Sequence, residues 1–212
     1  MKPAANLTQV TPVLHGWAAF QTAWKVYFNS YAFHTPDGLI LIDPTKPNAP
    51  ALKELEVLGT PAAIILTNAH HARDAAWFRK TYGIQVYANK NAHTDCEIKI
   101  DVPIVDGENL PGGLQAIFLP GVSASEMALH GPEVLLLGDA ILNTPGKGLE
   151  LMPEQFIEDK KQYRHSLLRL LELQYEVVTF GHGEPLLADG KKTIATFLKS
   201  LVPTQNSSGK AR

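Results

Sequence analysis

Polar residues follow short apolar segments at five places along the chain, and this repeated pattern restricts the fold more than any other feature of the sequence. The five junctions lie at Asp43 and at residues 67–74, 121–126, 138–139 and 181–183. Residues that follow the strands of a sheet gather at its edge, where binding sites are usually built. We therefore expect the five junctions to converge on one site.

The segments between these junctions alternate between strand and helix patterns. Residues 26–34 and 39–42 flank a Thr-Pro-Asp-Gly turn and predict a hairpin. This order suits two sheets that pack together with helices outside them. It suits one doubly wound sheet less well. The other strands are expected at 62–66, 84–87, 114–119, 134–137 and 177–180, and helices at 50–58, 74–82, 153–173 and 191–201.

Composition limits the class of protein. The 212 residues are 45% hydrophobic, which suffices for one core, so we expect a single domain over 1–202 and a flexible polar tail over 203–212. The 19 basic and 21 acidic residues give a net charge of -2, which argues against nucleic acid or a membrane as partner. The lone cysteine, Cys96, favours a cytoplasmic location, and the oligomeric state stays open.

The second junction carries the most informative motif. Thr67 ends an apolar run and is followed by Asn68-Ala69-His70-His71-Ala72-Arg73. This arrangement resembles the metallo-β-lactamase superfamily, in which a threonine precedes a His-x-His-x-Asp-His motif that binds one or two metals. In that register only the second histidine of the motif is kept, as His70.

The later junctions extend the resemblance along nearly all of the chain. Valine occupies the next ligand position, at Val122, whereas Asp139 matches the family's bridging aspartate and His182 its last histidine. The resemblance implies an α+β fold, a four-layer αββα sandwich of two mixed β-sheets with outer helices. It also implies that His70, Asp139 and His182 could hold at most one divalent metal, Zn, Fe or Mn.

The same motif also allows a second register. A shift of two residues would place His70 at the first ligand position and Asp74 at the family's aspartate. That shift also moves the helix over 74–82 out of step with the preceding strand, so we prefer the unshifted register.

The substituted positions predict further roles. Arg73 stands where a histidine would bind metal, and since a guanidinium has no lone pair we expect it to pair with Asp139 instead. Asn68, His71, Arg73 and Glu126 are predicted substrate-binding residues, although capping a helix is the commoner role for an asparagine such as Asn68. Adjacent residues at a strand end tend to point in opposite directions, so we expect His71 at the surface or behind a ligand.

Three functions remain open on the sequence. The first is a divergent hydrolase of a small ester, thioester, amide or phosphoester, in which Asp139 and His182 are the catalytic residues. The second is a metal-free pseudoenzyme that holds an anionic small molecule at the former metal site. The third is an interaction protein with a vestigial cleft, because a fold alone does not establish an activity.

Overall fold

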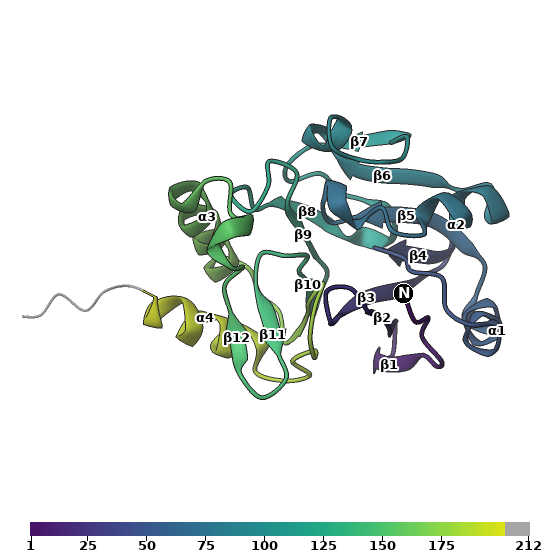
Figure 1. Ribbon diagram of the computed structural model, residues 1–212, viewed down its shortest axis with the longest axis horizontal. Coiled ribbons are helices and arrows are strands. Elements are labelled where there is room, and N and C mark those ends of the chain that lie inside the picture. Colours follow the sequence, from purple (N-terminus) through teal and green to yellow (C-terminus); the bar gives the residue numbers. More distant parts are fainter. Residues whose placement is uncertain (202–212) are drawn as a thin grey trace, which may run out of the picture.

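The computed structural model describes residues 1–201, and the polar tail predicted over 203–212 lies outside the described residues. Two β-sheets pack face to face, and helices cover the outer face of each (Figure 1). The order of layers is helix, sheet, sheet, helix. The predicted αββα sandwich is therefore confirmed.

The first sheet has seven strands in the order β1-β2-β3-β4-β5-β6-β7. Neighbours from β1 to β4 run antiparallel, and β4 to β7 run parallel. The strands are β1 (Thr8–Thr11), β2 (Leu14–Gln21), β3 (Val26–Thr35), β4 (Gly38–Ile42), β5 (Pro61–Leu66), β6 (Gln85–Asn89) and β7 (Val102–Ile104).

The second sheet has four strands in the order β13-β10-β9-β8, and a separate pair, β11 and β12, forms a hairpin beside it. Within this sheet β10 and β13 are parallel, and the other neighbours are antiparallel. The strands are β8 (Gln115–Phe118), β9 (Met127–His130), β10 (Val134–Leu136), β11 (Leu142–Thr144), β12 (Gly148–Glu150) and β13 (Val177–Thr179).

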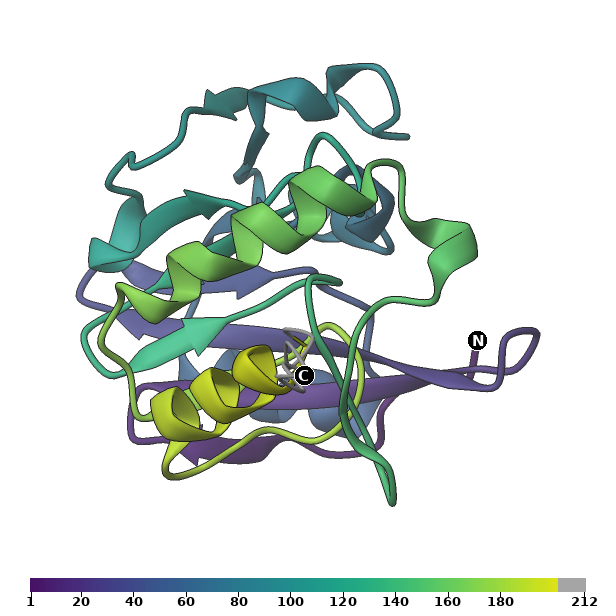
Figure 2. The same ribbon diagram turned by 90° about the vertical axis from the view of Figure 1, so that its left-hand side faces the viewer.

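Within residues 1–201, four α-helices form the outer layers. Helices α1 and α2 lie on the first sheet, and α3 and α4 lie across the second, as the turned view shows (Figure 2). The α-helices are α1 (Ala49–Leu58), α2 (Ala75–Tyr82), α3 (Lys160–Leu167) and α4 (Gly190–Ser200). Short 3₁₀ turns are η1 (Ala69–His71), η2 (Lys90–His93), η3 (Pro111–Gly113), η4 (Glu154–Phe156) and η5 (Leu168–Leu171).

Side-chain alternation along the strands explains the layers. In β4, Ile40 and Ile42 point into the core between the sheets, whereas Leu39 and Leu41 point toward α1 and α2. Successive residues of a strand face opposite sides of a sheet, so a strand that is apolar throughout must be covered on both faces. The buried run from Leu39 to Ile42 thus requires a layer on each side.

Within residues 1–201 the sequence predicted seven of the thirteen strands and missed β1, β2, β7, β9, β11 and β12. The single helix expected over 153–173 is three pieces: η4 is separated from α3 by residues 157–159, whereas η5 follows α3 directly. The cause is local, since Asp159 accepts hydrogen bonds from the backbone N–H groups of Lys161 and Gln162 and so begins α3 there.

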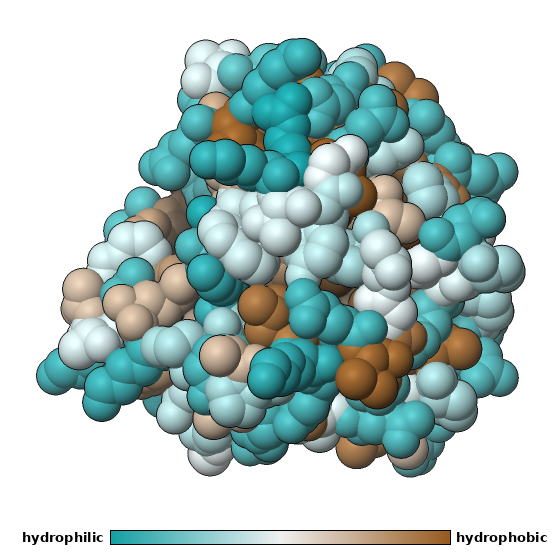
Figure 3. Space-filling model, turned by 90° about the vertical axis from the view of Figure 1, so that its right-hand side faces the viewer, coloured by the Kyte–Doolittle hydropathy of each residue, from teal (hydrophilic) through white to brown (hydrophobic). Residues whose placement is uncertain are grey.

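The surface over α1 and α2 is mostly hydrophilic, with separate hydrophobic patches (Figure 3). Among residues 1–201 no helix has both the length and the apolar character needed to cross a bilayer.

A shallow depression of about 530 Å³ beside α1 is lined by residues such as Leu7, Pro50 and Val57. None of the five sequence junctions contributes to its lining.

Candidate metal centre

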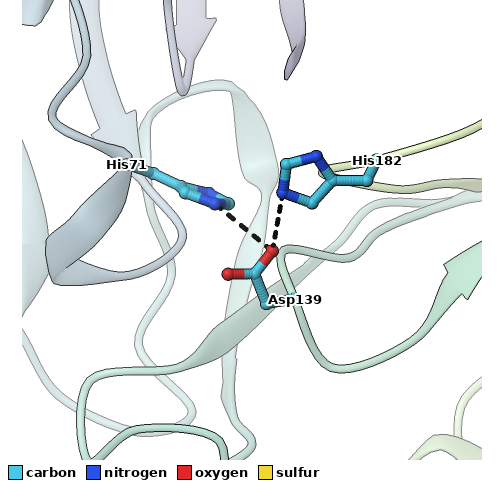
Figure 4. A group of neighbouring side chains, drawn as sticks. All are labelled: His71, Asp139 and His182. Carbon is cyan, nitrogen blue, oxygen red and sulfur yellow. Dashed lines mark ion pairs between the residues drawn. The ribbon is translucent and has the colours of Figure 1, made fainter. Parts of the chain in front are cut away.

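Three side chains from distant parts of the chain converge where the strands end. His71 closes the η1 turn after β5, Asp139 follows β10, and His182 follows β13. One ligand atom of each lies within 4.8 Å of the other two. Both imidazoles point at the same carboxylate (Figure 4).

A single oxygen is the focus of this cluster. Asp139 Oδ1 lies 3.3 Å from His71 Nε2 and 3.2 Å from His182 Nε2. It is buried, and no described residue donates a hydrogen bond of acceptable geometry to it. The His71 side chain is 5% exposed and that of His182 is 21% exposed, so the cluster opens to solvent on the His182 side.

The far nitrogen of each imidazole is fixed by an oxygen. His71 Nδ1 donates to Asp43 Oδ2 at 2.8 Å, and His182 Nδ1 donates to the backbone carbonyl of Tyr27 at 2.7 Å. Asp43 is itself held by Thr67, which donates from its backbone N–H and its hydroxyl. Such contacts set the tautomer and the direction of a metal-binding histidine.

Asp139 is held from behind by two buried side chains. Glu126 Oε1 accepts hydrogen bonds from the backbone N–H groups of Asp139 and Ala140, at 2.7 and 3.1 Å. Asn68 Nδ2 donates to Glu126 Oε2 at 2.9 Å and to Asp139 Oδ2 at 3.3 Å. The loop that carries Asp139 is thus fixed independently of any ligand.

The charges in this cluster are strongly coupled. Burial opposes a charged imidazole, but the carboxylates of Asp139 and Asp43 outweigh it and raise the pKa of His71 to about 9. Burial likewise opposes ionisation of Asp139, but His71 and His182 lower the pKa of Asp139 well below its ordinary value. Burial and the nearby Asp139 carboxylate raise the pKa of Glu126 to about 8.

These atoms fit a divalent cation. Each Nδ1 is committed as a donor, so a neutral imidazole directs its Nε2 lone pair at Asp139 Oδ1. Three electron-rich atoms so close together need a positive charge between them, either a proton or a metal. Two imidazole nitrogens and one carboxylate oxygen are suitable ligands for Zn²⁺, Fe²⁺ or Mn²⁺.

The structure does not bring the predicted ligand His70 into the cluster, and its neighbour His71 lies there instead. The His70 side chain is exposed, and its backbone N–H donates to Asn68 Oδ1. The chain after Thr67 turns as a 3₁₀ helix rather than continuing as a strand, so the expected alternation of side chains does not hold. The turn brings His71 Nδ1 to 3.0 Å from Thr67 Oγ1.

Two of the predicted substrate contacts are enclosed instead. Asn68 is 1% exposed and Glu126 is 0% exposed, and both lie behind Asp139. Asn68 does cap a helix, as predicted. It caps η1, where its side chain accepts from the His70 backbone N–H, rather than the next helix. Asp74, the aspartate of the shifted register, accepts from the backbone N–H of Lys46 and is not among the clustered ligands.

Arg73 does not form the predicted ion pair with Asp139. Among the described residues it donates through Nη1 to the backbone carbonyls of Asn29 and Asp43, and its guanidinium lies 4.8 Å from the centre of the Phe28 ring. Its φ of 41° is unusual for a residue with a side chain. This backbone turn directs the arginine toward β3, which the sequence did not indicate.

Comparison with known proteins identifies the family of this chain. A family model described as the metallo-beta-lactamase superfamily matches residues 7–201. A comparison with curated protein sequences finds no significant match.

Solved structures provide further matches. A metallo-beta-lactamase superfamily protein from Sulfolobus tokodaii matches with a TM-score of 0.70 and 19% identity, covering 95% of this chain and 90% of that chain. The protein TTHA1623, solved in a di-iron-bound form, matches with a TM-score of 0.63 and 27% identity, covering 79% of this chain and 92% of that chain.

The metallo-beta-lactamase FIM-1 from Pseudomonas aeruginosa, in its mono-zinc form, matches with a TM-score of 0.72 and 15% identity. The match covers 93% of this chain and 96% of that chain. The family match spans nearly the whole chain, and the likeness in fold covers the same region. The chain therefore belongs to the metallo-β-lactamase superfamily.

Proposed function

We propose that this protein is a hydrolase of a small ester, thioester, amide or phosphoester that works with one divalent metal held by His71, Asp139 and His182. The observation that carries the proposal is the approach of both Nε2 atoms to the otherwise unpartnered Asp139 Oδ1. The solved relatives with iron or zinc support a metal of this kind. When bound, such a metal would polarise the scissile group and activate a water molecule.

The chain's own residues have separate tasks in this proposal. Asp43 and the Tyr27 carbonyl fix the rings of His71 and His182, so that no reorientation is needed on binding. Glu126 fixes the loop of Asp139 through two backbone N–H groups. These contacts prepare the ligands before the metal arrives.

The more open side of the cluster is bordered by aromatic rings. Phe28 lies 5.4 Å from His182, and Trp24 lies 5.8 Å from Phe28, measured between ring centres. Trp24 is 70% exposed. An apolar part of a substrate would contact these rings while its reactive group faces His182 and Asp139.

A second candidate function is metal-free binding of an anionic small molecule, and one observation favours it. Arg73 Nε and Nη2 are buried without a hydrogen-bond partner among the described residues. These two groups form the edge of a guanidinium that grips a carboxylate or phosphate with two parallel hydrogen bonds. Acetate or inorganic phosphate should then raise the Tm of metal-free protein, and an unchanged Tm across both anions would remove this candidate.

Hydrolysis of model substrates tests the first proposal. Protein loaded with Zn²⁺, Fe²⁺ or Mn²⁺ should hydrolyse at least one of a carboxylic ester, a thioester, an anilide and a phosphodiester, and a chelator should abolish the activity. The matched variants are His182→Ala, expected to be inactive, and His165→Ala, an exposed histidine of α3, expected to be unaffected. Equal turnover by His182→Ala would overturn the assignment.

A further inference from the structure

We infer that this centre accepts one cation only, and that the Arg73 guanidinium supplies the second positive charge that the buried carboxylates require. The inference rests on the proposed function, because it assumes that His71, Asp139 and His182 bind a metal. Relatives of the same fold include a di-iron form and a mono-zinc form. The fold therefore accommodates one metal or two.

Few carboxylate oxygens near the cluster are free to bind a cation. Asp43 Oδ1 accepts from the Thr67 backbone N–H, and Asp43 Oδ2 accepts from the Thr67 hydroxyl and from His71 Nδ1. Both oxygens of this carboxylate are therefore committed to donors. A cation would have to displace buried hydrogen bonds to reach them, and leaving their buried donors unpaired is unfavourable.

The other two carboxylates are similarly engaged. Glu126 Oε1 accepts from two backbone N–H groups, and Glu126 Oε2 accepts from Asn68 Nδ2. Asn68 Nδ2 also donates to Asp139 Oδ2. Asp139 Oδ1 is the one carboxylate oxygen of Asp43, Glu126 and Asp139 that lacks such a donor. One free oxygen and two imidazoles suffice for one metal.

The Arg73 guanidinium lies beside residues that contact both histidines of the cluster. Its Nη1 donates to the Asp43 backbone carbonyl, so the guanidinium lies beside the residue that fixes His71. Its other neighbour, Phe28, also contacts His182. A fixed positive charge near both histidines repels any additional cation and partly offsets the negative charge of Asp43 and Asp139.

Arg73 has no carboxylate partner of its own among the described residues. Among the described residues it makes no ion pair, and two of its nitrogens have no hydrogen-bond partner. A buried guanidinium is costly unless nearby negative charge compensates it. The negative charge available here is that of the metal centre itself.

Metal titration of the full-length chain tests the inference, with Arg73→Met to remove the charge and Arg73→Lys to keep it. Metal-free protein is titrated with Zn²⁺ and with Co²⁺, and the bound metal is counted by mass spectrometry after desalting. His15→Gln serves as a control, because His15 Nδ1 lies 3.2 Å from His34 Nε2 and this pair could bind metal weakly elsewhere.

The wild-type chain should bind one metal per chain. Arg73→Met should still bind one, since it adds no ligand, but about tenfold or more tightly because a repelling charge is gone. Arg73→Lys should stay within about threefold of the wild type. Two metals per wild-type chain, or an Arg73→Met affinity equal to or weaker than that of the wild type, would overturn the inference.

The same titration separates this inference from the proposed function. No bound metal in the wild-type chain contradicts the proposed function, and the inference with it. Two bound metals contradict the inference alone. If Arg73→Met does not fold, the wild-type stoichiometry and the comparison with Arg73→Lys still decide the outcome.

Discussion

Asp43 and His71 are 28 residues apart in sequence, yet Asp43 Oδ2 and His71 Nδ1 lie 2.8 Å apart. The contact joins the residue that follows β4 to the η1 turn that follows β5, and these two strands are parallel neighbours. Both residues are buried, at 2% and 4% exposed. The position of this imidazole is therefore set by strand pairing and not by the local sequence alone.

Changing Asp43 to Asn should weaken metal binding without removing it. The amide can still accept from Thr67, but it no longer offers His71 a charged acceptor, so the ring is less well oriented. Loss of such a contact typically costs about 10- to 100-fold in metal affinity. A Zn²⁺ competition assay measures it, with Asp37→Asn in an exposed turn as the control. Equal affinity in both variants would show that Asp43 has no part in the site.

Tyr163 links α3 to the loop of Asp139. Its hydroxyl donates to the Ala140 carbonyl at 2.5 Å and accepts from the Met152 backbone N–H. Tyr163→Phe leaves that buried carbonyl without its donor, so the free energy of unfolding should fall by about 1–3 kcal/mol. Urea denaturation measures the loss. Tyr27→Phe, at a position 55% exposed, should change stability by less than about 0.5 kcal/mol.

Gly121 admits no side chain. Its φ is +135°, and an added Cβ would lie 2.2 Å from the Tyr163 Cα. Gly121→Ala should therefore cost more than about 4 kcal/mol or prevent folding, since backbone atoms of α3 would have to move. Gly83→Ala, at a φ of +66° with open space around it, should cost only about 1–2 kcal/mol. Similar losses in the two variants would contradict the close approach of Gly121 to α3.

The His15 and His34 pair on β2 and β3 predicts a weak dependence of stability on pH. Partial burial and the neighbouring His34 lower the pKa of His15 below its ordinary 6.5. The folded chain then binds fewer protons than the unfolded chain, so this contribution is complete above pH 6.5 and is lost as the pH falls through the folded pKa. His34→Gln should therefore lose less stability than the wild type between pH 7 and pH 5 in urea titrations. A steeper loss of stability in His34→Gln than in the wild type would contradict the lowered pKa of His15.

The sequence predicted the layers and the converging strand ends, because both follow from buried apolar runs and the polar residues after them. It selected His70 as the ligand, whereas His71 lies in the cluster. Which of the two enters the site depends on the 3₁₀ turn after Thr67, and a spacing of four residues from Thr67 to His71 was the available signal. The path of Arg73 depends on a positive φ, for which the residue type gave no warning.

The assignment of His71 as a metal ligand is tested most directly by the metal content of the wild-type chain, His71→Ala and His70→Ala. The two histidines are adjacent in sequence, but only His71 lies within reach of Asp139 and His182. One divalent metal per chain is expected in the wild type and in His70→Ala, and a loss of metal is expected in His71→Ala. A wild-type chain that binds no metal, or a His70→Ala variant that loses it while His71→Ala keeps it, would contradict the account.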